Sequence, residues 1–249
     1  MGRKLKDYYN SAYINLLADK LAVHLKIFDA AGFSCFTKKG VAGKGLLQRQ
    51  DVFVEAFEKY LPNNYAQNLK LFTKILGPTL PTEQGMYNLG WWLWPMGRYV
   101  EKHGAQNIAA SLDFIYELTQ RFTGEFAIKP LLEANPKLVM KTMLRWSKDP
   151  NVHVRRLASE GLRTRLPWAK KTLAALEHPE VYLKILENLK SDSSRFVQKS
   201  IGNNLNDLYK DRPDLAEKIV KSWQKTGAEK ETLWIIKHGQ RNQKTTRGR

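Results

Sequence analysis

The second half of this 249-residue chain repeats itself at an interval of about 40 residues, and this repeat constrains the fold more than any other feature. One copy covers residues 143–158 and a second covers 186–201, which aligns Arg156 with Lys199. A third, weaker copy places Lys237 at the same position. An interval of this length has room for two helices in each copy, so neighbouring copies are expected to stack and bury their apolar faces against one another.

The apolar spacing is helical along nearly the whole chain. Between Tyr13 and Leu21, apolar residues return every three or four positions, as one face of a helix requires. Pro136, Pro150, Pro179 and Pro213 each stand where a helix can begin, a position that tolerates proline. We therefore predict an all-α, HEAT-like helical-repeat solenoid with a concave basic groove.

The predicted boundaries are one repeat domain over residues 1–240 and a basic tail over 241–249. The tail has four cations, no acid and no large apolar residue, so it is expected to be disordered and to add sequence-independent affinity for DNA.

The charge of the chain points to a polyanionic partner. Lys and Arg number 41 against 24 Asp and Glu, a net charge of +17 that repels itself in the compact state. Arg156, Lys199 and Lys237 hold equivalent positions in successive copies, and equivalent positions of a solenoid share one face. The row is interpreted as a track for phosphates. The alternatives are a merely basic, solvated surface and a chance alignment.

Composition excludes several classes of protein. Cys35 is the single cysteine, which excludes an internal disulfide and a multi-cysteine zinc site and favours a reducing cytoplasm. The five histidines lack paired ligand spacing, so no metal is predicted. No stretch approaches the roughly 20 apolar residues of a membrane span. Residues 40–45 lack the spacing of a phosphate-binding loop and are interpreted as a flexible loop.

Two segments carry the candidate chemistry, residues 121–130 and 149–169. The second segment places Arg156 and Glu160 at positions i and i+4, on one face of a helix, and Trp168 follows a proline just past the predicted helix end. A cation, a carboxylate and a large aromatic ring are thereby expected close together.

These segments resemble the signature of the AlkC family of DNA alkylation-repair glycosylases. The run from Val154 to Trp168 is similar to its most distinctive stretch, and Phe122 to Pro130 to another. Further resemblance lies in residues 5–10, 94–100, 197–207 and 234–238, so it covers nearly the whole chain. Where this chain departs from the family pattern, Lys129 stands in place of an expected arginine and Thr164 in place of an expected proline; Asn203, Asn204 and Gly239 are also less typical.

The resemblance implies a monofunctional glycosylase that removes cationic N-alkylated bases such as 3-methyladenine from duplex DNA, without flipping the base and without a cofactor. A monomer is expected. By motif position Glu125 and Glu160 match the family's active-site carboxylates, Trp168 an aromatic residue lining the site, and Arg156 a cation near it. The residues expected to contact the DNA backbone are Arg155, Arg163, Arg165, Lys199 and Lys237.

The chemistry supports these roles. An alkylated purine already carries positive charge and leaves easily, while the sugar gains positive charge as the bond breaks. A fixed carboxylate stabilises that charge and can orient water, and an indole can contact a cation through its π face.

Each of these residues also has a structural explanation. Glu160 could pair with Arg156, Glu125 could be favoured by a helix dipole, and Trp168 could be a core residue. Asn206 and Asp207 are expected to cap or cross-link helices. Trp91, Trp92 and Trp94 remain open between core and groove. The rival functions are a non-catalytic HEAT-like module that binds DNA or protein, and an RNA-binding solenoid.

Overall fold

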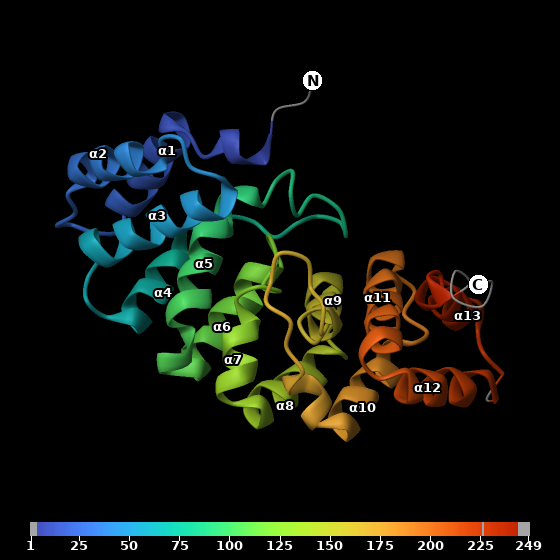
Figure 1. Ribbon diagram of the computed structural model, residues 1–249. Coiled ribbons are helices and arrows are strands. Elements are labelled where there is room, and N and C mark those ends of the chain that lie inside the picture. Colours follow the sequence, from blue (N-terminus) through green and yellow to red (C-terminus); the bar gives the residue numbers. More distant parts are fainter. Residues whose placement is uncertain (1–3, 226, 244–249) are drawn as a thin grey trace. The chain divides into compact units, whose positions relative to one another are not determined.

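The computed structural model describes residues 4–225 and 227–243 of the chain (Figure 1). The described residues form α-helices and short 3₁₀ helices and contain no β-strand, which confirms the all-α prediction. None of the described helices is long and apolar enough to cross a membrane. The chain divides into two compact units, residues 1–123 and 124–249.

The first unit packs its helices around aromatic side chains. Its α-helices are α1 (Ser11–Ala22), α2 (Ala30–Val41), α3 (Leu46–Tyr60), α4 (Tyr65–Ile75), α5 (Trp94–His103) and α6 (Ile108–Thr119), with 3₁₀ helices at Leu5–Tyr8, Trp91–Leu93 and Gly104–Asn107. Trp94 is buried in the core. Trp91 lies against the rings of Tyr9 and Tyr13, and the Tyr13 hydroxyl donates to the Trp92 carbonyl, so these tryptophans help hold the first unit together.

The second unit is built from helix pairs. Its α-helices are α7 (Ile128–Ala134), α8 (Pro136–Trp146), α9 (Val152–Glu160), α10 (Pro179–Leu189), α11 (Arg195–Asp211), α12 (Pro213–Lys225) and α13 (Lys230–Gly239), with a 3₁₀ helix at Ala174–Glu177. Pro136, Pro179 and Pro213 begin helices as predicted. Pro150 does not, because Asn151 caps α9 through its side chain and the helix begins at Val152.

The second helices of the pairs, α9, α11 and α13, lie side by side, and the first helices α8 and α10 also contact each other (Figure 1). Two hydrogen bonds mark the repeat at the same sequence separation of 41 residues, Asn188 to Ser147 at 2.8 Å and Ser191 with Thr232 at 3.3 Å. These contacts confirm the HEAT-like repeats and their predicted interval.

Helices α11 and α13 approach so closely that glycine is needed on both. A Cβ atom on Gly239 would lie 2.6 Å from the Cβ of Leu205, and one on Gly202 would lie 2.7 Å from the His238 ring. Gly239, atypical in the sequence, therefore has a packing explanation.

The first residues of the segment predicted as a tail are bound to the last repeat. Arg241 donates to the carbonyl of His238 and to Asn203, and Asn242 donates to Asn206. Residues 244–249 lie outside the described residues.

Candidate active site

Arg155 fastens the beginning of α9 to the next repeat. Its guanidinium donates to the carbonyl oxygens of Asp149 and Pro150, and Nε lies 2.7 Å from the Asp192 carboxylate. Asp192 is also the side chain that accepts from the backbone N–H of Ser194. This pair holds the starts of α9 and α11 together.

Arg156, the next residue of α9, bridges the two predicted carboxylates. Its Nη1 lies 2.5 Å from Oε2 of Glu125, and its Nη2 lies 3.4 Å from Oε1 of Glu160. Both glutamates are buried, with 5% and 4% of their surface exposed. The guanidinium also lies over the ring of Phe196 in α11, 5.0 Å from its centroid. The structure thus brings together three residues that the sequence singled out.

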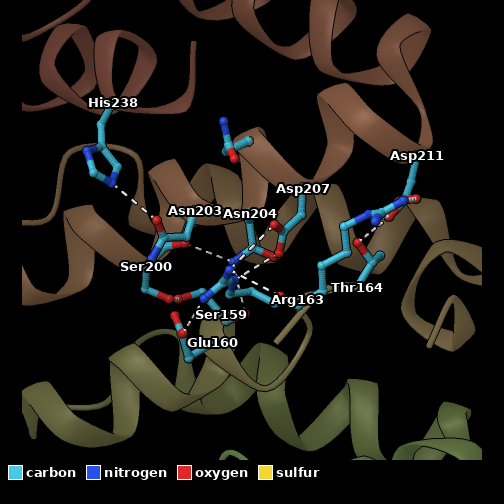
Figure 2. A network of polar contacts seen from close by, with 12 residues as sticks. Ser159, Glu160, Arg163, Thr164, Ser200, Asn203, Asn204, Asp207, Asp211 and His238 are labelled. Carbon is cyan, nitrogen blue, oxygen red and sulfur yellow. Dashed lines mark hydrogen bonds and ion pairs between the residues drawn. The ribbon is translucent and has the colours of Figure 1, made fainter. Parts of the chain in front are cut away.

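Arg163 continues the network towards α11 (Figure 2). Its Nη1 lies 2.8 Å from Oε1 of Glu160, and its Nε lies 2.9 Å from Oδ2 of Asp207. The Arg163 side chain is buried, and Lys129 donates to its backbone carbonyl at 2.5 Å. Asp207 thus cross-links α11 to the end of α9, as the structural interpretation of that residue predicted.

We call these side chains the charge cluster: Glu125, Lys129, Arg156, Glu160, Arg163 and Asp207. It holds three acids and three bases, so its formal charges balance when every member is ionised. Buried charges are tolerated when they are paired and hydrogen-bonded in this way.

Glu160 is held in its ionised form. Burial opposes this, but Arg156, Arg163 and a hydrogen bond from the Ser200 hydroxyl outweigh burial and lower the pKa of the carboxyl below its usual value. Such a group is suited to stabilising positive charge rather than to donating a proton.

Lys129 holds its proton less tightly than an exposed lysine does. Burial lowers the pKa of its ammonium group to about 8, although Glu160 and other neighbouring carboxylates act in the opposite direction. A lysine at this position, where arginine was expected, therefore makes the cluster respond to pH near 8.

The segment from Gly161 to Leu173, here called the tryptophan loop, connects α9 to the 3₁₀ helix before α10 (Figure 1). Asp211, near the end of α11, anchors it at both ends. Arg165 and Lys171 approach the Asp211 carboxylate at 2.7 and 2.6 Å, and the Thr164 hydroxyl donates to it at 2.7 Å. These contacts lower the pKa of Asp211 well below its usual range despite partial desolvation.

Trp168, within this loop, is held in an unfavourable conformation. Its φ angle is +64°, in the left-handed region that disfavours side chains, and 65% of its surface is exposed. Strained backbone that presents a large apolar ring to solvent is typical of a binding site and not of a core residue. This exposure excludes the core interpretation of Trp168.

The cations predicted to contact DNA fall into two groups. Lys199 and Lys237 are exposed on α11 and α13 and form no ion pair within residues 4–225 and 227–243. Arg155 and Arg163 are engaged inside the unit, and Arg165 is exposed but paired with Asp211. The structure therefore leaves the two lysines most available to an external anion.

The sequence interpretation missed Lys129, Asp211 and Lys171 as parts of this site. Asp207 and Asp211 stand at i and i+4 on α11, a spacing that puts two acids on one helix face, and this signal was available. Among the described residues no group of His, Cys, Asp and Glu side chains is arranged to hold a metal ion.

Known proteins resemble this chain in sequence and in fold. Residues 123–247 match the model of the DNA alkylation repair enzyme family. The uncharacterized protein YhaZ of Bacillus subtilis (strain 168) is 40% identical over 181 residues, which are 73% of this chain and 48% of YhaZ. The chain thus spans about half the length of that relative.

Two solved structures share the fold. The Pseudomonas fluorescens alkylpurine DNA glycosylase AlkC, bound to DNA containing an abasic site analog, is 31% identical with a TM-score of 0.84; the match covers 98% of this chain and 65% of AlkC. AlkD2 from Streptococcus mutans is 20% identical with a TM-score of 0.51 over 85% of this chain and 97% of AlkD2, a likeness of fold alone. The similarity to AlkC confirms the resemblance inferred from the motifs, and the chain belongs to the DNA alkylation repair enzyme family.

Proposed function

We propose that this chain hydrolyses the N-glycosidic bond of cationic N-alkylated bases, such as 3-methyladenine, in duplex DNA. The observation that carries the proposal is the pair of buried carboxylates, Glu125 and Glu160, bridged by Arg156. Family membership supports it, as does the similarity to a DNA glycosylase bound to DNA. The proposal concerns a chain that spans 65% of that enzyme.

In the proposed reaction, water adds to C1′ of the deoxyribose and the bond from C1′ to the base nitrogen breaks. The bonding electron pair neutralises the cationic base, so the leaving group needs neither an acid nor a metal. The sugar becomes positively charged in the transition state, and the ionised carboxylates stabilise it and accept a hydrogen bond from the attacking water. The water loses one proton to the solvent as the product alcohol forms, so the products are the neutral base, the abasic site and a proton.

The arginines of the cluster act as positioning residues in this proposal. Arg156 and Arg163 fix the carboxylates before substrate arrives, so little reorganisation is needed at the moment of reaction. Arg155 holds α9 to the next repeat. Phosphate contact is assigned to Lys199 and Lys237, with Arg165 at the edge of the tryptophan loop.

Trp168 is the proposed lesion contact. Its exposed indole offers a π face to a cationic base or to the charged sugar. Asp211 holds both ends of the loop, so the ring is presented without ordering the loop on binding. Contact with the alkylated nucleotide from outside the DNA duplex fits an enzyme that works without flipping the base.

The second candidate is a DNA-binding module without catalysis. The observation in its favour is that Glu125 and Glu160 are both buried and engaged by arginine, as a purely structural ion network would be. The two functions differ in whether loss of a carboxylate charge affects base release or stability alone.

The test is single-turnover release of 3-methyladenine from N-methylated duplex DNA by the wild-type chain, Glu160→Gln and Glu125→Gln. Each substitution keeps the shape of the side chain and removes its charge, and it should slow release by roughly 10²–10³-fold. Binding to an abasic-site analogue should stay within about threefold of wild type, because phosphate contacts are unchanged.

Both substitutions also leave an arginine with one fewer buried partner, so some loss of stability is expected. The matched control is Asp192→Asn, which removes a buried, arginine-paired carboxylate at the other end of α9. It should lose stability similarly and release base at nearly the wild-type rate. Equal rates in all variants would favour the binding module, and so would an absence of release by wild type.

A further inference from the structure

A second polar cluster lies on the same row of helices, one repeat beyond the charge cluster. Lys199 and Asn203 stand at i and i+4 on α11, His238 lies in the last turn of α13, and Arg241 lies in the turn that follows that helix. Asn203 Oδ1 accepts hydrogen bonds from Nε2 of His238 and from Nη2 of Arg241, both at 3.1 Å, and Figure 2 shows the first of these. We call these four residues the amide cluster.

The two clusters occupy equivalent repeat positions. The sequence repeat aligns Arg156 with Lys199, and the same alignment places Asn203 where α9 has Glu160. The helices agree with it, because side chains cap α9 and α11 in the same way, from Asn151 and from Ser194. The repeat therefore keeps the cation and replaces the carboxylate by an amide.

That replacement leaves the positive charge at this position without a carboxylate partner. Arg156 faces two carboxylates, whereas Lys199 and Arg241 form no ion pair within the described parts of the chain. Asp207 lies within electrostatic reach of Arg241, but its carboxylate is bound to Arg163. The amide cluster thus presents two cations whose charge is not cancelled locally.

The cluster is also fixed in place before any ligand arrives. Arg241 Nη1 donates to the His238 carbonyl at 2.6 Å, and the His238 ring stacks on Trp234 with centroids 4.9 Å apart. Burial, with Arg241 and Lys199 nearby, lowers the pKa of His238 to about 4. The ring is therefore neutral at pH 7 and serves as a hydrogen-bond donor to Asn203.

Because Asn203 Oδ1 accepts from two donors, its amide nitrogen is the group left for an external acceptor. Within the described residues Nδ2 of Asn203 makes no hydrogen bond, and the side chain is half-buried. Lys199 and Arg241 both act electrostatically on His238, which donates to Asn203. Ammonium, guanidinium and amide N–H groups in one neighbourhood suit a phosphate oxygen.

We propose that Lys199, Asn203 and Arg241 form a binding site for a backbone phosphate of the DNA strand, with His238 as a positioning residue. The site rests on the proposed function for the identity of its partner. It is distinct from the carboxylate site, because its residues contact the phosphate and take no part in breaking the bond to the base.

The experiment recreates the α9 arrangement in α11. Asn203→Asp puts a carboxylate beside Lys199 and Arg241, where it neutralises them and repels phosphate. Affinity for an undamaged duplex should fall about tenfold at 0.1 M salt, and the slope of log affinity against log salt should become shallower by about 1. Arg241→Gln should change the slope by a similar amount.

The matched control is Gln224→Glu, which makes the same change from amide to carboxylate at an exposed position of α12. It should leave affinity within about twofold and the slope unchanged. Thermal melting of all variants checks that the fold is kept.

Wild-type affinity and slope in both Asn203→Asp and Arg241→Gln would overturn the proposal. The outcome is separable from the proposed function, because binding to undamaged DNA requires no base release. If the wild-type chain releases base and both variants bind undamaged DNA as wild type does, the phosphate site alone is refuted. If Asn203→Asp binds DNA weakly and the wild-type chain releases no base, the glycosylase activity alone is refuted.

Discussion

Helices α9 and α11 begin in the same way and continue differently. Each is capped by a side chain that follows an aspartate, and each carries a cation in its second turn. In α9 that cation is enclosed by acids and the helix ends after 9 residues. In α11 an amide, Asn203, follows the cation four residues later, and the helix has 17 residues. A helical repeat can thus keep its packing and change its chemistry through one side chain on the shared face.

The largest effect expected from this comparison is on stability. Arg156→Met should lower the free energy of unfolding by about 3–5 kcal/mol, because it leaves Glu125 and Glu160 buried without their bridging cation. Lys199→Met, at the equivalent position of α11, should change it by less than about 0.5 kcal/mol. Urea unfolding of both variants measures the difference, and equal losses would contradict the claim that only one repeat depends on its cation.

The second effect is a pH dependence confined to the charge cluster. Lys129 faces Glu125, Glu160, Asp207 and Arg163, and burial lowers the pKa of its ammonium from 10.5 to about 8. Between these values the unfolded chain binds the proton more tightly than the folded chain, so stability increases with pH and is lost as pH falls towards 8.

From pH 7.5 to 9.5 this group should add roughly 2 kcal/mol to the free energy of unfolding. Lys129→Arg keeps its proton throughout and should lack the increase, which makes it the matched control. The measurement is urea unfolding of both proteins at five pH values. If the free energies of unfolding of the two proteins changed with pH in parallel, Lys129 would not be buried as described.

The tryptophan loop gives the smallest effect. At the repeat position where α11 continues as a helix, α9 has already ended, and the chain forms the tryptophan loop. This loop holds Trp168 at φ +64°. Trp168→Gly should be more stable than Trp168→Ala by about 1 kcal/mol, because glycine adopts this conformation without strain. Both variants should release base more slowly by a similar factor. Greater stability of the alanine variant would contradict a strained loop.

What the sequence could predict was local. Apolar spacing and prolines at helix starts predicted the helices, because both depend on residues within one or two turns. The repeat interval predicted how the helices pair, because copies of one sequence pattern pack in the same way. Arg156 and Glu160 were paired correctly for the same reason, as they lie four residues apart.

The long-range contacts could not be predicted in this way. Arg163 was expected on the DNA-facing surface, but its charge is taken up by Asp207, 44 residues later. Arg165 likewise meets Asp211 across 46 residues. Which cation meets which acid depends on how α9 and α11 stack, and no pattern within either helix encodes that partner. Lys199 is exposed on α11, whereas Arg156 at the equivalent repeat position is enclosed by acids, so repeat position alone does not determine exposure; contact of Lys199 with DNA stays a prediction.

The most direct test of the comparison measures Glu160→Gln and Asn203→Asp together, each for single-turnover base release and for affinity to undamaged duplex DNA. The account predicts a crossed result. Glu160→Gln loses roughly 10²–10³-fold in release and keeps its affinity, while Asn203→Asp releases base at nearly the wild-type rate under saturating enzyme and binds about tenfold more weakly. If both variants lost both properties in proportion, or neither variant lost either, the residue four positions after the shared cation would not determine what each repeat does.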